Sequence, residues 1–228
     1  MLGEYIGAGS SVTKILLHLN TNSDDESGNS KDGVDTSITY TDGKIGNGSA
    51  CFSGSSKITC NASNLNFSGT DSFTQSLWVN LSSMPASGEI CMLTIIASDA
   101  GTRTYDKGIA ITDSGIADCY VYNSGEYHCS SSTGVIVKDT WYNIVFTYDG
   151  TNMKIYVNSI LKKTTAAPGS TAINSPYLVL SNLANYSWLG KTVVRVNGYI
   201  DEVIIESGAW THTEVQKYYT QALGRFNN

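Results

Sequence analysis

The segment DEVIIE holds three carboxylates, Asp201, Glu202 and Glu206, and paired carboxylates are the groups that hydrolyse glycosidic bonds. Such a pair must lie roughly 5–10 Å apart across the bond that is broken. Alternating apolar residues predict a strand here, with Glu202 and Glu206 on one face and Asp201 on the other. Four residues of strand span about 13 Å, so the two glutamates are too far apart for this reaction.

No other familiar catalytic or metal-binding pattern occurs in the sequence. It lacks the G-x-S-x-G turn of serine hydrolases and a glycine loop that could hold phosphate. The three histidines, His18, His128 and His212, are isolated from one another, and neither CxxC nor HxxxH offers a zinc site. We therefore predict that the protein is not an enzyme.

Five cysteines occur, so at least one is unpaired. Cys51 and Cys60 flank a short polar turn that would place them opposite each other, and the same holds for Cys119 and Cys129. Free thiols on hairpins are the favoured interpretation, with disulfides as the alternative.

Aromatic residues in polar surroundings are candidates for carbohydrate binding, because a sugar ring stacks on a flat aromatic side chain while polar groups bind its hydroxyls. The candidates lie on an expected hairpin and in the polar segment SNLANYSWLGK, and they are Tyr120, Tyr122, Tyr127, Tyr186 and Trp188. The alternative for each is simple packing at the rim of a β-fold, with the polar atom reaching water.

Composition and charge exclude several classes of protein. The 228 residues carry a net charge of −6 with 14 basic residues, which disfavours binding to nucleic acids and to anionic membranes. No apolar run is long enough to span a membrane, and the first 20 residues lack the basic start and apolar stretch of a signal peptide. The sequence therefore predicts synthesis in a cytoplasm.

Hydrophobic alternation predicts an all-β protein that ends in one helix. Strands are expected at 13–19, 72–80 and 89–98, a hairpin at 45–60, three strands within 108–130, a strand–turn–strand–turn unit at 140–164, and last strands at 176–182 and 198–207. Thr211 and Glu214 form a capping box, and Trp210 can pack on Val215 as a hydrophobic staple. We expect a helix from there to Gly224.

Four segments, in order, resemble a known family. WYNIVFTYDGTNMKIYVN (141–158) resembles the Y-D-G … I-Y-V-N-G hairpin of laminin-G-like domains, which belong to the concanavalin A-like lectin/glucanase group of jelly-roll sandwiches. LLHLNTNSDDESGN, GKIGNGSACFSGSSKITC and NGYIDEVIIESGAWTHTEV resemble the opening, second and closing segments of that family. Ser159 stands where the family has glycine, so a longer turn or one of another type is expected there.

The resemblance implies an antiparallel two-sheet jelly-roll sandwich. It also implies that Trp78 and Trp141 are buried and that a structural Ca²⁺ lies between Asp25 of the opening loop and Asp201 of the IDEV strand. The alternative for the aspartates is a solvated acidic loop and a local backbone cap. Because relatives include glucanases, a glycoside hydrolase or lyase is the third functional possibility.

The favoured function is a non-catalytic recognition or structural module. We expect residues 1–12 to form a flexible arm and residues 13–228 to form one domain. The sequence resembles decoration, head-fibre or tail-appendage proteins of bacteriophage virions, which implies a virion location, contacts with other virion proteins through the arm, and an oligomeric or arrayed state. A glycan or a host surface is the expected ligand, and a secreted or cell-surface lectin or adhesin is the alternative.

Overall fold

A computed structural model describes residues 12–97, 105–169, 176–181 and 187–224. Its elements, in chain order, are β1 (Val12–Leu17), β2 (Gly33–Thr36), β3 (Thr39–Thr41), β4 (Ser49–Phe52), β5 (Lys57–Asn61), the 3₁₀-helix η1 (Ser63–Leu65), β6 (Phe73–Leu81), β7 (Glu89–Ala97), β8 (Tyr105–Thr112), β9 (Ala117–Tyr122), β10 (Glu126–Ser130), β11 (Tyr142–Tyr148), β12 (Asn152–Val157), β13 (Ile160–Ala166), β14 (Tyr177–Leu180), β15 (Ser187–Trp188), β16 (Lys191–Val194), β17 (Gly198–Ser207) and α1 (His212–Gly224).

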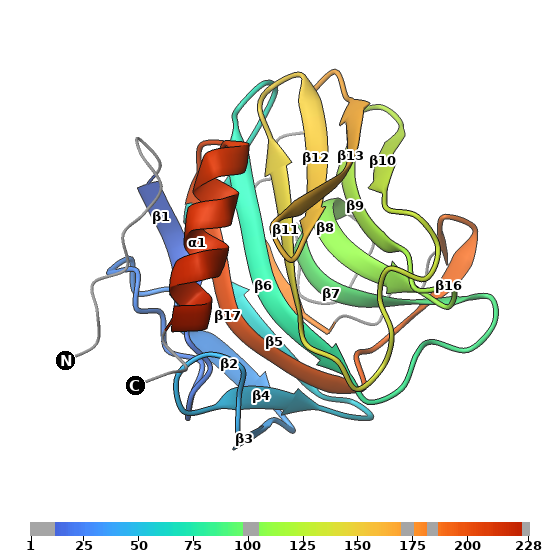
Figure 1. The fold of residues 1–228 in the computed structure, drawn as a ribbon. Coiled ribbons are helices and arrows are strands. Elements are labelled where there is room, and N and C mark those ends of the chain that lie inside the picture. The colour runs from blue at the N-terminus through green and yellow to red at the C-terminus, as the bar shows by residue number, and fades with distance from the viewer. Residues whose placement is uncertain (1–11, 98–104, 170–175, 182–186, 225–228) are drawn as a thin grey trace.

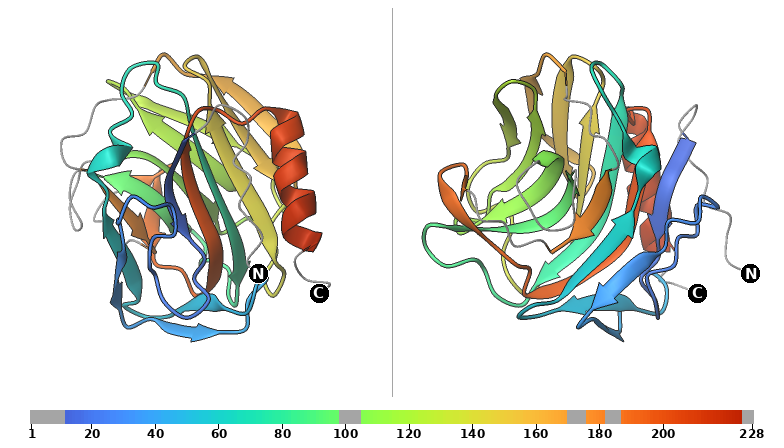
Figure 2. Two further views of the ribbon diagram at one scale, coloured as in Figure 1. Left: turned by 90° about the vertical axis from the view of Figure 1, so that its left-hand side faces the viewer. Right: turned by 180° about the vertical axis from the view of Figure 1, so that it is seen from behind.

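The strands form two stacked, curved sheets (Figures 1 and 2). The first sheet has the order β13-β12-β11-β6-β17-β4-β3, with β1 also paired to β17. The second has the order β10-β9-β8-β7-β14-β5-β2, and the short hairpin β15–β16 joins it through β7. Every described pairing is antiparallel except that of β16 with β7. The predicted all-β sandwich with one C-terminal helix is confirmed.

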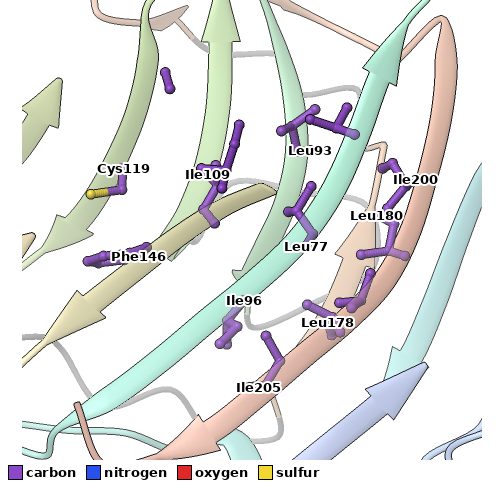
Figure 3. Packing of buried hydrophobic residues seen from close by; sticks show 14 of the residues in the cluster. Leu77, Leu93, Ile96, Ile109, Cys119, Phe146, Leu178, Leu180, Ile200 and Ile205 are labelled. Carbon is purple, nitrogen blue, oxygen red and sulfur yellow. The ribbon is translucent and has the colours of Figure 1, made fainter. Parts of the chain in front are cut away.

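The main core lies between the sheets, where side chains at every second position meet. Leu77 and Phe146 of the first sheet face Ile109 and Cys119 of the second, and all four are fully buried (Figure 3). A period of two places alternate residues of a strand on opposite faces, so the residues between them point outward. Trp78, between Leu77 and Val79, accordingly lies on the outer face of its sheet.

Helix α1 covers that outer face, lying along β17 and β6 (Figure 1). The capping box forms as predicted: the Thr211 N–H donates to Oε2 of Glu214 at 2.6 Å, and the Glu214 N–H donates to Oγ1 of Thr211 at 3.3 Å. Trp78 is buried beneath the helix, with its ring 5.5 Å from that of Tyr219. Trp141, also expected to be buried, is half-buried and packs against the apolar cluster that lies between the first sheet and α1.

The turn between β12 and β13 departs from the sequence-based prediction. Val157 pairs directly with Ile160, so Asn158 and Ser159 form a two-residue loop. Both have positive φ, at 50° and 64°, which is the left-handed geometry of a type I′ turn. The expectation of a longer turn or another turn type is therefore wrong, and Ser159 adopts the conformation that glycine would take without steric cost.

Replacing Ser159 with glycine should stabilise the protein. A non-glycine residue in the left-handed region is strained by about 1–2 kcal/mol, and glycine removes this strain. Part of the gain is cancelled because glycine also makes the unfolded chain more flexible and so raises its entropy. We expect the free energy of unfolding to rise by about 0.5–1 kcal/mol, measured by urea denaturation. Unchanged or lower stability of the Ser159→Gly variant would show that the hydroxyl makes a compensating contact.

The predicted hairpin at 45–60 is wrong. Strand β4 belongs to the first sheet and β5 to the second, so the turn between them crosses from one layer to the other. Cys60 points into the core while Cys51 points away from it, and the two thiols do not face each other. The prediction for Cys119 and Cys129 is confirmed, because they are direct cross-strand partners in β9 and β10. All five cysteines are free thiols.

Strand β1 begins at Val12, which pairs with Ser207 of β17. The last residue of the predicted arm is thus part of the first sheet, and residues 1–11 lie outside the described residues. Among the described helices, none has the length and apolar character needed to cross a membrane.

Candidate functional site

A groove opens where three connections between strands meet. Its first hollow, of about 440 Å³, is lined by Gly54, Ser55, Arg195, Val196 and Asn197. The second, of about 300 Å³, shares Arg195 and Asn197 and is further lined by Ser83, Met84, Pro85, Ala86, Glu89, Cys91 and Val194. We call the two together the three-loop groove, since it is built by the β4–β5 turn, the β6–β7 loop and the β16–β17 loop.

Arg195 supplies a fixed positive charge to both hollows. Its Nη1 donates to the carbonyl oxygens of Ser181 at 2.8 Å and of Ser56 at 3.4 Å, which ties the side chain to two neighbouring segments. Partial burial lowers the pKa of the guanidinium below its usual value, yet an arginine remains charged at neutral pH. Within the described parts of the chain, no carboxylate lies within ion-pair distance of Arg195.

The rest of the groove combines polar and apolar groups. The Asn197 amide donates to Oγ of Ser83 at 3.0 Å, and Oε2 of Glu89 accepts from the backbone N–H of Ala86 at 3.0 Å. Met84 adds apolar surface beside them. Donors, acceptors and apolar area within one open hollow are the combination that binds a hydroxyl-rich small ligand.

The hairpin β15–β16 leads directly into Arg195, and two contacts anchor it to the second sheet. Nζ of Lys191 donates to Asp113 at 2.9 Å, and this bond holds the pKa of the Asp113 carboxyl below its usual value. At the other strand of the hairpin, the Trp188 indole N–H donates to Oδ2 of Asp118 at 2.6 Å. Strand β16 itself pairs in parallel with β7, beside which it lies in Figure 1.

Asp118 is the centre of a polar cluster on the outer face of β9 and β10. Its fully buried carboxylate accepts hydrogen bonds from Trp188, from Nδ1 of His128 at 2.8 Å and from Oγ of Ser130 at 2.6 Å. The ring of Tyr120 lies 4.4 Å from that of Trp188 and 5.1 Å from that of His128. Three donors satisfy this buried charge, which makes the cluster a rigid support for the hairpin.

The structure brings together two of the five aromatic residues predicted to bind sugar. Tyr120 and Trp188 are in contact, but only 5% and 2% of their surfaces are exposed, so they lie beneath the surface. Tyr122 is on the same outer face and is 40% exposed. Tyr127 lies on the opposite face and packs against the main core, and Tyr186 is outside the described residues.

The two aspartates predicted to bind calcium each accept hydrogen bonds from a different loop. Asp25 accepts four hydrogen bonds, from the N–H groups of Leu16, Ser27 and Lys31 and from the Ser27 hydroxyl. Oδ2 of Asp201 accepts from the N–H groups of Lys44 and Ile45, both at 2.7 Å. The described chain holds no cluster of three His, Cys, Asp or Glu side chains suited to a metal ion.

The alternation expected for DEVIIE fails at a bulge in β17. Glu202 has a φ of 48°, and the register shifts between Asp201 and Ile204. Ile200 and Val203 both point into the core, so Asp201 and Glu202 both face outward, contrary to the prediction of opposite faces.

Both glutamates of this segment are engaged in structural contacts. Glu202 contacts Nδ1 of His18 at 2.7 Å. Glu206 is fully buried and accepts from the Thr13 hydroxyl at 3.0 Å and the Trp210 indole at 2.6 Å. Neither carboxylate faces the three-loop groove.

The groove residues were not predicted from the sequence. Arg195 and Asn197 come from the β16–β17 loop and Ser83 from the β6–β7 loop, and none of the three belongs to a recognised ligand-binding motif. The signal in the sequence was weak: Arg195 is one of 14 basic residues in a chain of net charge −6.

Comparison with known proteins assigns the chain to a superfamily. A model of the concanavalin A-like lectin/glucanases superfamily matches residues 52–216. A search of curated proteins gave no significant match. Among solved structures, domain 4 of AbnA, an extracellular GH43 arabinanase from Geobacillus stearothermophilus, in complex with arabinotriose, is similar with a TM-score of 0.70 at 22% identity, over 91% of this chain and 98% of that one.

Two further structures are similar over 92% of this chain. The binding domain of Paraclostridial Mosquitocidal Protein 1 has a TM-score of 0.69 at 17% identity, with 52% of that chain covered. The ligand-binding domain of botulinum neurotoxin serotype D, in complex with N-acetylneuraminic acid, has a TM-score of 0.67 at 14% identity, with 51% covered. The protein thus spans about half the length of these two chains, and at such identities the likeness establishes the fold.

Proposed function

The chain belongs to the concanavalin A-like lectin/glucanases superfamily, and on this basis we propose that it is a non-catalytic module that binds glycans in the three-loop groove. The observation that carries the proposal is the groove itself, where a fixed guanidinium, an amide, a carboxylate and apolar surface meet in open hollows. Rigid sandwiches commonly bind their ligands through the loops at their ends.

The similar structures support a binding role. The arabinanase domain is seen with arabinotriose, and the neurotoxin domain with N-acetylneuraminic acid. Within this chain, Glu202 and Glu206 are held by structural partners, and Glu89 is the single carboxylate among the described residues that line the groove. Because glycoside hydrolysis uses a pair of carboxylates, this composition favours binding over cleavage.

Asn197→Ala should weaken glycan binding by about five- to tenfold, since the exposed amide lines both hollows and a lost hydrogen bond to a ligand costs about 1–1.5 kcal/mol. The measurement is a glycan array followed by calorimetric titration with the best ligand. Asn61→Ala, an exposed asparagine at the end of β5, is the matched control and should bind like the parent. Equal affinity of the Asn197 and Asn61 variants would place the site elsewhere, and cleavage of any bound glycan would refute a non-catalytic role.

Calcium binding remains a prediction, and it depends on Asp201. Burial raises the pKa of this carboxyl to about 8, and its Oδ1 is buried without a hydrogen-bond partner among the described residues. Such an oxygen fits a hard cation. The four donors on Asp25 fill the acceptor positions of its carboxylate, so Asp25 could bind an ion only by exchanging them.

If the ion binds, excess calcium should raise the melting temperature and chelation should reverse the effect. At a hundredfold excess over the dissociation constant the gain is about 2.7 kcal/mol. Asp201→Asn should abolish the response, and a response that survives this change would assign the ion to other residues.

The setting of the module also remains a prediction. The sequence favours a virion decoration, head-fibre or tail-appendage protein held through residues 1–12, with a secreted or cell-surface lectin or adhesin as the alternative. A structure of the native assembly tests this directly. It should show residues 1–12 in contact with another virion protein, and a chain found free in the extracellular medium would favour the alternative.

A further inference from the structure

We propose that the three-loop groove selects acidic glycans, with the oxyanion of one sugar bound by Arg195 in the first hollow. This inference rests on the proposed function, because it names the class of ligand for the same site. The oxyanion is a carboxylate or a sulfate ester, and both present the paired oxygens that a guanidinium binds through two parallel N–H groups.

The hydrogen bonds of Arg195 leave part of its guanidinium available. Nη1 is used for the carbonyl oxygens of Ser181 and Ser56, and neither Nη2 nor Nε has a partner among the residues described. The two carbonyls therefore fix the plane of the group without neutralising its charge. A guanidinium held in place before binding loses little entropy when a ligand arrives, and its charge-assisted hydrogen bonds are about twice as strong as neutral ones.

The two hollows differ in charge, which orients the ligand. Among the residues that the structure describes, none that lines the first hollow is acidic, and its members besides Arg195 are Gly54, Ser55, Val196 and Asn197. The second hollow holds Glu89 and would repel an anion. The acidic sugar therefore binds over the first hollow, and a neighbouring neutral sugar donates hydroxyl hydrogen bonds toward Glu89.

The first hollow is also sterically open. A Cβ atom placed on Gly54 would meet nothing within 4 Å, and Ser55 is exposed. The whole chain carries a net charge of −6, so attraction of an anion must come from Arg195 at short range. The Debye length is about 8 Å at physiological ionic strength, so the distant negative charges are largely screened.

The test compares acidic glycans with matched neutral ones by calorimetric titration: sialyllactose and sulfated lactose against lactose, and oligogalacturonate against its methyl ester. We expect an acidic member to bind at least about tenfold more tightly than its neutral partner. The carboxylate and sulfate ligands together identify which oxyanion the groove prefers.

Variants at Ser55 test the charge without removing Arg195 from its structural contacts. Ser55→Glu should weaken binding of the acidic glycan by about tenfold and Ser55→Lys should strengthen it, while neutral glycans change little. Ser132→Glu, which adds the same charge at an exposed residue that lines neither hollow, is the control. Arg195→Lys keeps the charge but loses the planar fork, and it should also weaken binding by about tenfold.

The outcomes separate this inference from the proposed function. Tighter binding of neutral than of acidic glycans, or indifference to Ser55→Glu, would overturn the inference while glycan binding stands. Absence of binding to every neutral and acidic glycan would overturn both.

Discussion

Replacing Trp188 with alanine should lower the free energy of unfolding by about 3–5 kcal/mol. The indole is 2% exposed, packs on Tyr120, and donates to the buried carboxylate of Asp118. Truncation leaves a cavity and also removes one of three donors from a buried charge. Urea denaturation measures the loss, and glycan binding should fall as well because the anchored hairpin continues into Arg195.

Two variants give this prediction its controls. Trp188→Phe keeps most of the ring but lacks the N–H, so its free energy of unfolding should fall by less than that of the alanine variant. Leu189→Ala changes the neighbouring residue, which is 38% exposed, and should lower the free energy of unfolding by about 1 kcal/mol or less. Parent-like stability of Trp188→Ala would mean that the hairpin is not held by this contact.

Replacing Lys107 with methionine should stabilise the protein at neutral pH by a few kcal/mol and flatten its pH dependence. The lysine is fully buried on the inner face of β8, where Nζ donates to the Phe67 carbonyl at 3.1 Å and lies 5.8 Å above the Phe73 ring. Burial lowers the pKa of Lys107 from 10.5 to about 7. Methionine has a similar shape and carries no charge to desolvate.

The direction of the pH effect follows from which state binds more protons. Between pH values of about 7 and 10.5, the unfolded chain keeps the Lys107 proton while the folded chain releases it. The loss of folding stability caused by burying Lys107 therefore becomes smaller as the pH rises through this window. The advantage of Lys107→Met should therefore be largest at pH 7 and below and should fade by about pH 10. Lys163→Met, at an exposed position on β13, controls for the loss of one charge. A stability difference that is constant with pH would contradict the lowered pKa.

Much of the fold could be predicted because its signals are local. The period of two in β6 and in β11–β12 determines which side chains point inward, and the Thr211–Glu214 capping box marks the start of α1. These patterns depend only on neighbours within a few residues.

The errors occur where tertiary contacts override the local pattern. The turn after Phe52 looks like a hairpin, but β4 and β5 pair with strands of different sheets. In β17 the bulge at Glu202 turns two successive carboxylates outward, where the Lys44 and Ile45 amides bind Asp201 and His18 binds Glu202. Neither partner is adjacent in sequence, so alternation alone could not show the bulge.

The candidate site was harder to predict than the fold. Trp188 and Asp118 are separated by 70 positions, and Asn197 and Ser83 by 114. The sequence predicted sugar-binding roles for Tyr120 on a hairpin and for Trp188 in a polar segment, but both are buried and support the β15–β16 hairpin that leads into Arg195. The groove exists only once three loops meet, and no spacing in the chain signals it.

The most direct test of the glycan site is an NMR titration that maps which backbone amides shift when an acidic oligosaccharide is added. The predicted result is a contiguous set of shifts at Gly54, Ser55 and Asn197 that saturates with the ligand and needs about ten times more ligand to saturate in Ser55→Glu. Saturable shifts confined to the outer face of β9 and β10, around Tyr122, would contradict it.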